Sequence, residues 1–272
     1  MRIIDSHTHV NDERLIGERD QIIRNLESQG IESIIEMGCD IDTSKAAYEL
    51  SVKYANVYSA VGIHPHSAKE RKLSDYDYMR SIASSDKVVA IGEVGLDYYY
   101  DLSDREEQKT VFKEQIELAD ELRLPLVLHI RDAYKDLEDI LKDMKGHINS
   151  GLLLHCYSGS SEFVKVMAKY DAYFALGGAV TFKNAKKEDV IKTIPIDRLL
   201  IETDCPYLAP TPMRGSVNKP EYVIYTLKKI AETLNMDCEK LGDITYENTH
   251  RLFSKIKRTT EGSYGEKRYA DV

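Results

Sequence analysis

Histidine and carboxylate side chains lie at the ends of short apolar segments throughout this chain. His7 and His9 end the first segment, and because alternate residues of a strand face the same side, both imidazoles point the same way. The other candidates end later apolar segments: Glu93, His129, His155 and Asp204. Imidazole nitrogens combined with carboxylates are typical ligands of zinc, manganese or a similar divalent ion.

These six groups are more than one metal ion needs. A catalytic zinc site uses about three protein ligands and keeps a position open for water, whereas six groups suit two ions about 4 Å apart that share a carboxylate. A single histidine is more often a hydrogen-bonded structural residue, but coincidence explains six such groups at segment ends poorly. We therefore expect two divalent metal ions as cofactors, Mg²⁺, Mn²⁺ or Zn²⁺.

Eight apolar segments have the length and near-continuous hydrophobicity of parallel strands that are covered on both faces. The predicted strands are Arg2–His7, Ile31–Met37, Val57–Gly62, Val88–Val94, Leu126–Ile130, Leu152–His155, Ala172–Leu176 and Leu199–Thr203. Amphipathic segments predict helices over Asp20–Gln29, Asp104–Arg123, Asp132–Lys145, Ser160–Tyr170, Lys186–Ile194, Glu221–Leu234 and Leu241–Lys257.

A regular alternation of strand and helix requires a parallel sheet, and eight units favour a closed (β/α)8 TIM barrel over an open doubly wound sheet. The length of 272 residues suits such a barrel, which typically takes about 250. No Gly-x-Gly-x-x-Gly follows the first strand, which argues against dinucleotide binding. We expect residues 1–257 to form a single barrel domain, with the six groups at the carboxyl ends of its strands, and residues 258–272 to form a polar tail.

The composition is typical of a cytoplasmic enzyme. The net charge of −9 opposes a long footprint on a polyanion. No segment reaches the roughly 18 apolar residues needed to cross a bilayer, and the start of the chain has no apolar signal region. Its four cysteines form no Cys-x-x-Cys pair, as expected for reduced, mostly buried thiols. We expect no membrane association and see no sign of an obligate protein partner.

Six short motifs give the chain a resemblance to a known family. They are Asp5-Ser6-His7-Thr8-His9, Gly62-Ile63-His64-Pro65-His66, Gly92-Glu93-Val94-Gly95-Leu96-Asp97-Tyr98, Leu128-His129-Ile130-Arg131-Asp132-Ala133, His155-Cys156-Tyr157-Ser158-Gly159 and Glu202-Thr203-Asp204-Cys205-Pro206-Tyr207-Leu208. Together, and in this order, they resemble the TatD family of metal-dependent deoxyribonucleases, which is related to the amidohydrolases. The resemblance extends from Asp5 to about Phe253.

The resemblance implies a ligand set and a reaction. It implies His7, His9 and Glu93 around one metal ion, with Asp204 at the same ion. It implies Glu93, His129 and His155 around the other. The implied activity is hydrolysis of DNA phosphodiester bonds from the 3′ end, with DNA ends or short single strands as substrate. Glu93 and Asp204 are the expected catalytic groups, Asp204 accepting the proton of a metal-activated water.

Other functions remain open at this stage. The same site could hydrolyse an ester, lactone or amide of a small molecule, because fold and metals do not fix the substrate. A scaffold that only binds metal or nucleic acid is the other alternative, against which six intact ligands count. After the last strand the family commonly has Arg-Gly-Lys-Arg-Asn-Glu-Pro, whereas this chain has Arg214-Gly215-Ser216-Val217-Asn218-Lys219-Pro220, which puts the phosphate contacts of that loop in doubt.

Several further residues are candidates for supporting roles. The candidates for substrate contact are His64, Arg131 and Arg214. For Arg131 a salt bridge with a loop acid, and for His64 a loop hydrogen bond, are equally compatible with the sequence. Asp5 shares a face with His7, and Glu202 shares one with Asp204, so both are expected behind the ligands. The run Tyr98–Tyr100 could stack on a base or pack against the adjacent helix. His147 and His250 are expected at the surface without a role.

Overall fold

Eight parallel strands form one sheet in which each strand pairs with the next along the chain, from β1 to β8, in a computed structural model that describes residues 2–258. The strands are β1 (Ile3–Thr8), β2 (Ile31–Met37), β3 (Val57–Val61), β4 (Val88–Asp97), β5 (Leu126–Arg131), β6 (Leu152–Leu154), β7 (Tyr173–Leu176) and β8 (Leu199–Ile201). Hydrogen bonds from the His9 amide to the Cys205 carbonyl (2.8 Å) and from the Asp204 amide to the His7 carbonyl (3.0 Å) join the two ends. The predicted (β/α)8 barrel is confirmed.

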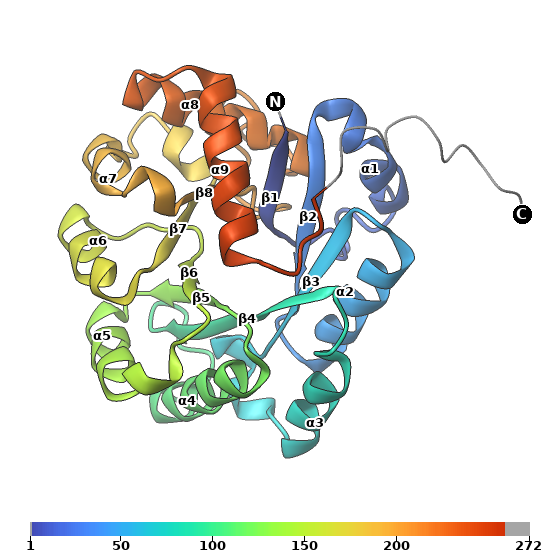
Figure 1. Ribbon diagram of the computed structural model, residues 1–272, viewed down its shortest axis with the longest axis vertical. Helices are drawn as coiled ribbons and strands as arrows, with labels where there is room; N and C mark the ends of the chain where they lie inside the picture. The colour runs from blue at the N-terminus through green and yellow to red at the C-terminus, as the bar shows by residue number, and fades with distance from the viewer. Residues whose placement is uncertain (1, 259–272) are drawn as a thin grey trace, which may run out of the picture.

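Helices surround the strands on the outside (Figure 1). They are α1 (Arg19–Asn25), α2 (Ile41–Lys53), α3 (Leu73–Ile82), α4 (Arg105–Leu122), α5 (Tyr134–Asp143), α6 (Ser161–Met167), α7 (Glu188–Thr193), α8 (Val223–Leu234) and α9 (Cys238–Leu252). The sequence pattern did not predict α2 and α3. The buried positions of α2 are mostly small or polar, such as Ser44 and Ala47, so this helix has little apolar periodicity. Its sequence signal is the cap at Asp40, whose carboxylate accepts from the Thr43 amide (2.8 Å).

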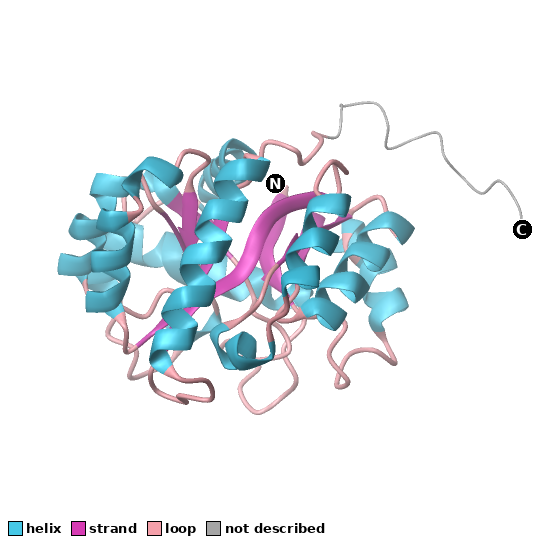
Figure 2. Ribbon diagram, turned by 90° about the horizontal axis from the view of Figure 1, so that it is seen from below, coloured by secondary structure: helices cyan, strands magenta, loops and turns pink. Residues whose placement is uncertain are grey.

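Apolar side chains fill the barrel interior, and α9 closes its amino end. Ile4, Ile35 and Leu200 belong to the same buried cluster as Phe253 and Ile256, which follow α9. Figure 1 looks onto this closed end, and Figure 2 shows long loops that project from the opposite end of the barrel. The carboxyl ends of the strands are therefore the end at which a site can form.

Some segment ends differ from those predicted. β4 extends to Asp97 instead of ending at Val94, while β6 and β8 stop at Leu154 and Ile201. His155 and Asp204 therefore lie just beyond their strands. Of the predicted tail, only Arg258 is described, and it pairs with Glu247 (2.6 Å); residues 259–272 lie outside the described part of the chain.

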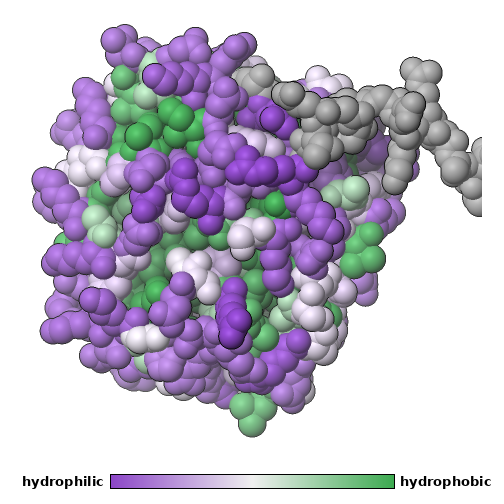
Figure 3. Space-filling model, viewed as in Figure 1, coloured by the Kyte–Doolittle hydropathy of each residue, from purple (hydrophilic) through white to green (hydrophobic). Residues whose placement is uncertain are grey.

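The surface and the remaining histidines partly match expectation. Polar and charged residues dominate the face shown in Figure 3. Across residues 2–258, no helix combines the length and the apolar character that crossing a membrane requires. His147 is exposed, as predicted. The prediction for His250 was wrong: it is only 7% exposed, because its ring packs edge-on against Tyr246 (4.5 Å) and its Nδ1 donates to the Ile256 carbonyl (3.2 Å).

Candidate metal centre

Glu93 lies at the centre of the six sequence-predicted ligands. Its Oε1 is 2.8 Å from His129 Nδ1 and 2.8 Å from His155 Nε2. Its Oε2 is 3.4 Å from His7 Nε2 and 3.6 Å from His9 Nε2. One carboxylate thus faces two pairs of histidines, one pair through each oxygen.

Asp204 completes the group from the end of β8. Its Oδ1 is 3.5 Å from His9 Nε2 and 3.7 Å from His7 Nε2. Three sets of side chains have ligand atoms close enough to share an ion: His7 with His9 and Glu93, His7 with His155 and Asp204, and His64 with Glu93 and His129. The structure therefore brings all six predicted ligands together.

His64 lies closer to this group than its predicted place among substrate contacts suggests. Its Nε2 is 3.5 Å from Glu93 Oε1, and its Nδ1 accepts from the His66 amide (3.2 Å), which is the loop hydrogen bond left open by the sequence. His64 therefore adds a seventh potential ligand beside His129. Burial lowers its pKa to about 4, so the ring is neutral near pH 7, the form in which histidine binds metals.

The charges and donors of the site fit divalent cations. Glu93 is 4% exposed, and within residues 2–258 both Glu93 and Asp204 form ion pairs with histidines but with no lysine or arginine. His7 Nε2 and His9 Nε2 approach to 3.2 Å. Buried carboxylates need a compensating positive charge. Two ring nitrogens that face each other need a proton or a cation between them, because their lone pairs otherwise repel. Metal ions held by these residues would supply both.

The electrostatics keep both carboxylates ionised. Burial raises the pKa of Glu93, but the charges of His155 and His64 and the hydrogen bonds from His129 and His155 outweigh burial, so its pKa lies well below the usual range. Burial also acts against ionisation of Asp204, and the hydrogen bond from His9 with the charges of nearby histidines again lowers its pKa. Metal binding requires deprotonated ligands, and these carboxylates meet that condition.

Asp5 and Glu202, which the sequence predicted behind the ligands, are both fully buried and contact segments that carry ligands. Asp5 accepts from the Thr203 hydroxyl (2.6 Å) and amide (2.9 Å), which ties β1 to the segment that carries Asp204. Its burial raises its pKa to about 8. Glu202 accepts from the Cys156 amide (2.6 Å) and lies 3.6 Å from His155 Nδ1.

Sequence reasoning missed Asp97, the last residue of β4. Its carboxylate is fully buried, and Oδ2 accepts from His129 Nε2 (3.1 Å) and His66 Nε2 (2.8 Å). A carboxylate on the far nitrogen of a ligand histidine fixes the ring orientation and its tautomer. The signal was available, because Glu93 and Asp97 are four residues apart in one strand and so share a face.

Glu36 and Cys39, around the end of β2, were also missed. Glu36 is 1% exposed and accepts from the Val10 (2.8 Å) and Asn11 (2.9 Å) amides, which fixes the loop that follows His9. Cys39 Sγ is 3.8 Å from Glu93 Oε2, at the edge of the ligand group. No spacing rule points to either residue, since their partners come from other strands.

The sequence of the loop after β8 differs from the family pattern, and its contacts in the structure explain part of that difference. Lys219 pairs with Glu18 Oε2 (2.7 Å) near the start of α1, and Asn218 donates to the Thr203 (2.8 Å) and Tyr207 (2.6 Å) carbonyls. These two side chains hold the loop in place. Arg214 is exposed, its guanidinium packs 3.9 Å from the centre of the Phe182 ring, and in the described part of the chain it forms no ion pair with the six ligands.

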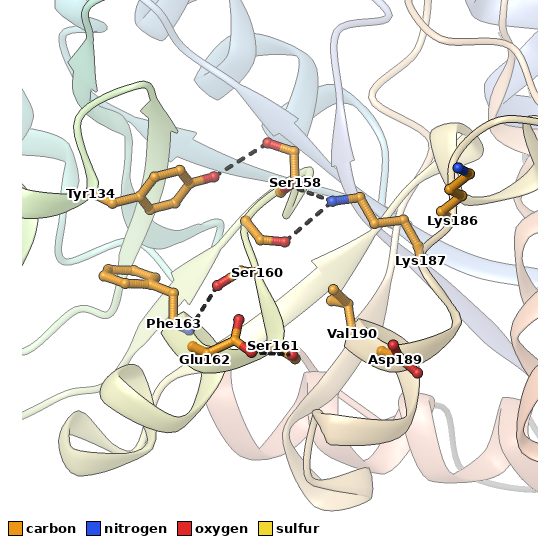
Figure 4. Close-up of a pocket in the computed structure, with 11 residues that line it drawn as sticks. Tyr134, Ser158, Ser160, Ser161, Glu162, Phe163, Lys186, Lys187, Asp189 and Val190 are labelled. Carbon is orange, nitrogen blue, oxygen red and sulfur yellow. Dashed lines mark hydrogen bonds between the residues drawn. The ribbon is translucent and has the colours of Figure 1, made fainter.

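A polar cavity of about 580 Å³ includes part of the segment that follows His155, although none of the six proposed ligands lines it. It is lined by Tyr134, Ser158, Gly159, Ser160, Ser161, Glu162, Phe163, Lys186, Lys187, Asp189 and Val190. Figure 4 shows the two aromatic rings on one side and Lys187 on the other, where it donates to the Ser158 and Gly159 carbonyls. The cavity has hydroxyl groups and charges of both signs, so it suits a polar ligand.

Comparison with known proteins places the chain in a family. The model of the family described as TatD related DNase matches residues 4–254. The chain is 43% identical to the uncharacterised metal-dependent hydrolase YabD of Bacillus subtilis, over 92% of this chain and 98% of the relative. It is 30% identical to the 3′-5′ ssDNA/RNA exonuclease TatD of Salmonella typhimurium, over 93% and 100% of the two chains.

Solved structures agree with this assignment. The crystal structure of YjjV, a TatD homologue from Escherichia coli, matches with a TM-score of 0.87 and 27% identity, over 93% of this chain and 98% of that one. The TatD hydrolase of Entamoeba histolytica matches with a TM-score of 0.84 and 23% identity, over 93% and 98%, which shows the shared fold. On the family model, the relatives and the barrel together, this chain belongs to the TatD family of metal-dependent hydrolases.

Proposed function

We propose that this protein is a two-metal deoxyribonuclease that removes nucleotides from the 3′ end of single-stranded DNA. The observation that carries the proposal is the position of Glu93, whose two oxygens face separate pairs of histidines at 2.8 Å and at 3.4 to 3.6 Å. A shared carboxylate of this kind is the arrangement expected between two ions. The relative from Salmonella typhimurium, named a 3′-5′ ssDNA/RNA exonuclease, supports the choice of substrate.

The residues divide between the two ions. His7, His9 and Asp204 would hold one ion, His129 and His155 the other, and Glu93 both; His64 lies close enough to join the second set. When bound, Mg²⁺, Mn²⁺ or Zn²⁺ would lower the pKa of a water ligand and withdraw charge from phosphoryl oxygens.

The chain's own groups would complete the reaction. Asp204 is ionised and lies at the edge of the ligand group with 13% of its side chain exposed, so its carboxylate can accept the proton of the attacking water. Asp97 holds the His129 ring in one orientation through Nε2. Arg131, two residues beyond His129, offers a planar guanidinium to a phosphate.

The acidic surface restricts the form of the substrate. With a net charge of −9, the protein would repel a long polyanion, so bound metal ions and nearby groups such as Arg131 would have to supply the charge that attracts phosphates. A strand end or a short single strand meets this condition, because only a few phosphates need to approach.

Hydrolysis of a single-stranded oligonucleotide tests the proposal. We expect a 5′-labelled 12-mer to shorten stepwise from its 3′ end in the presence of Mg²⁺ or Mn²⁺, and to remain intact after the protein is treated with a chelator. Readdition of the metal should restore cleavage. Intact DNA in the presence of folded, metal-loaded protein would refute the nuclease proposal and favour ester, lactone or amide substrates.

A further inference from the structure

Two exposed tyrosines and one arginine form a platform at the mouth of the barrel. Tyr99 and Tyr100 are 59% and 54% exposed, although large rings are normally covered. The Arg131 guanidinium carbon lies 3.8 Å from the centre of the Tyr99 ring and 4.8 Å from that of Tyr100. Tyr98 is not part of this platform, because its hydroxyl donates to Asp136 (2.6 Å). We name Tyr99, Tyr100 and Arg131 the tyrosine platform.

Asp97 fixes the tyrosine platform relative to the metal ligands. Its Oδ1 accepts from the amides of Tyr99 and Tyr100, both at 2.9 Å, while its Oδ2 accepts from His129. The Tyr100 ring also packs edge-on against His66, with ring centres 5.5 Å apart. The same buried carboxylate therefore positions the tyrosine platform and a proposed ligand, so any group on the platform lies at a set place beside the ligands.

The positive charge of the Arg131 guanidinium is available to bind an anion. Among residues 2–258, no carboxylate lies within ion-pair distance of its guanidinium, even though the chain has 46 acidic residues against 37 lysines and arginines. The salt bridge that the sequence left open for Arg131 is therefore not formed. A guanidinium stacked on a ring keeps its N–H groups free at its edge for a phosphate.

A third exposed tyrosine lies on the other side of the ligand group. Tyr207 is 46% exposed, and its ring centre is 6.1 Å from that of His9. The Arg14 guanidinium carbon lies 4.3 Å from the centre of this ring and is held there by Asp12 (2.7 and 2.8 Å). Arginine-stacked tyrosines thus flank the ligands on the His129 side and on the His9 side.

We propose that the tyrosine platform binds an unpaired base of the nucleotide next to the bond being cut, while Arg131 contacts a phosphate of the same strand. The proposal rests on the proposed nuclease function and adds its selectivity for single strands. Aromatic and guanidinium planes accept any base by stacking, but only when the base is free of a duplex. The tyrosine platform would thereby select single-stranded ends without reading their sequence.

Replacement of both rings tests the tyrosine platform. We expect the double variant Tyr99→Ala/Tyr100→Ala to raise KM for a single-stranded hexamer by about tenfold or more, with kcat within about threefold, since stacking on an aromatic ring contributes about tenfold in affinity per base. Tyr99→Phe/Tyr100→Phe should retain the wild-type KM, because stacking needs the ring and not the hydroxyl. Val52→Ala, at an exposed apolar position on α2, is the matched control.

Binding measured without turnover separates this inference from the nuclease proposal. A fluorescent, phosphorothioate-linked hexamer, which resists hydrolysis, gives Kd by anisotropy for the metal-loaded proteins. A base-free residue near its 3′ end should weaken binding to the wild type and leave binding to the double alanine variant unchanged. If the base-free residue weakens binding to both proteins equally, the tyrosine platform does not bind the base. An unchanged Kd and KM in the alanine variant would contradict the proposal in the same way. If the wild type binds the hexamer through the tyrosine platform but does not cleave DNA, the nuclease proposal is wrong.

Discussion

Glu93→Gln is expected to lower the hydrolysis rate by at least about 1,000-fold, equivalent to about 4 kcal/mol of transition-state stabilisation. The substitution keeps the size of the side chain but removes the negative charge and one of the two oxygens that face the histidine pairs. A neutral amide offers only one oxygen and cannot bridge two cations, so one proposed ion position would lose its ligand and the other would lose the negative charge.

The readouts for Glu93→Gln are kcat and metal content. We expect bound metal to fall below the wild-type level while the far-ultraviolet circular dichroism spectrum stays unchanged, since the strands pair independently of this side chain. Glu117→Gln, an exposed position on α4, is the matched control for the same chemical change and should behave as the wild type. Activity above a tenth of the wild-type rate at saturating metal would show that Glu93 is not shared by catalytic ions.

Gly95→Ala is expected to have the largest effect on stability. Gly95 has a φ of +138°, which L residues avoid, and an added Cβ would lie 2.1 Å from the carbonyl oxygen of His129 on the paired strand β5. Neither backbone can move without separating β4 from β5, the strands that carry Glu93 and His129. We expect a loss of at least about 3 kcal/mol in the free energy of unfolding, from backbone strain and lost strand pairing.

Urea denaturation followed by circular dichroism measures the effect of Gly95→Ala. Gly146→Ala is the matched control, because a Cβ at Gly146 would meet no heavy atom within 4 Å. It should change the free energy of unfolding by less than about 1 kcal/mol. A stability difference of that small size for Gly95→Ala would mean that β4 and β5 are not packed as closely as described.

The sequence predicted the barrel and the ligand group because both follow from local patterns. Apolar runs mark buried parallel strands, and parallel strands bring their carboxyl ends together, so residues such as His7 and Asp204 could be placed in one site without knowledge of the fold in detail. The sequence pattern did not predict α2 because its buried residues include Ser44 and Ala47, which form no apolar stripe. Their burial depends on the neighbouring strands.

The supporting residues were harder to predict because their partners are distant in the sequence. Lys219 pairs with Glu18, 201 positions away, and no spacing pattern encodes that contact. Asp97 orients His129 and also holds the Tyr99 amide, a double role that appears only when β4 and β5 lie side by side. The sequence left a substrate contact and a salt bridge open for Arg131, and its stacking on Tyr99 depends on which neighbours the fold supplies.

Anomalous diffraction from crystals grown with Mn²⁺ tests most directly whether Glu93 joins two metal ions. We predict two anomalous peaks about 4 Å apart, one between Glu93 and the pair His7 and His9, and the other between Glu93 and the pair His129 and His155. Peaks only at the protein surface, or a single fully occupied peak that does not contact Glu93, would contradict the two-metal centre.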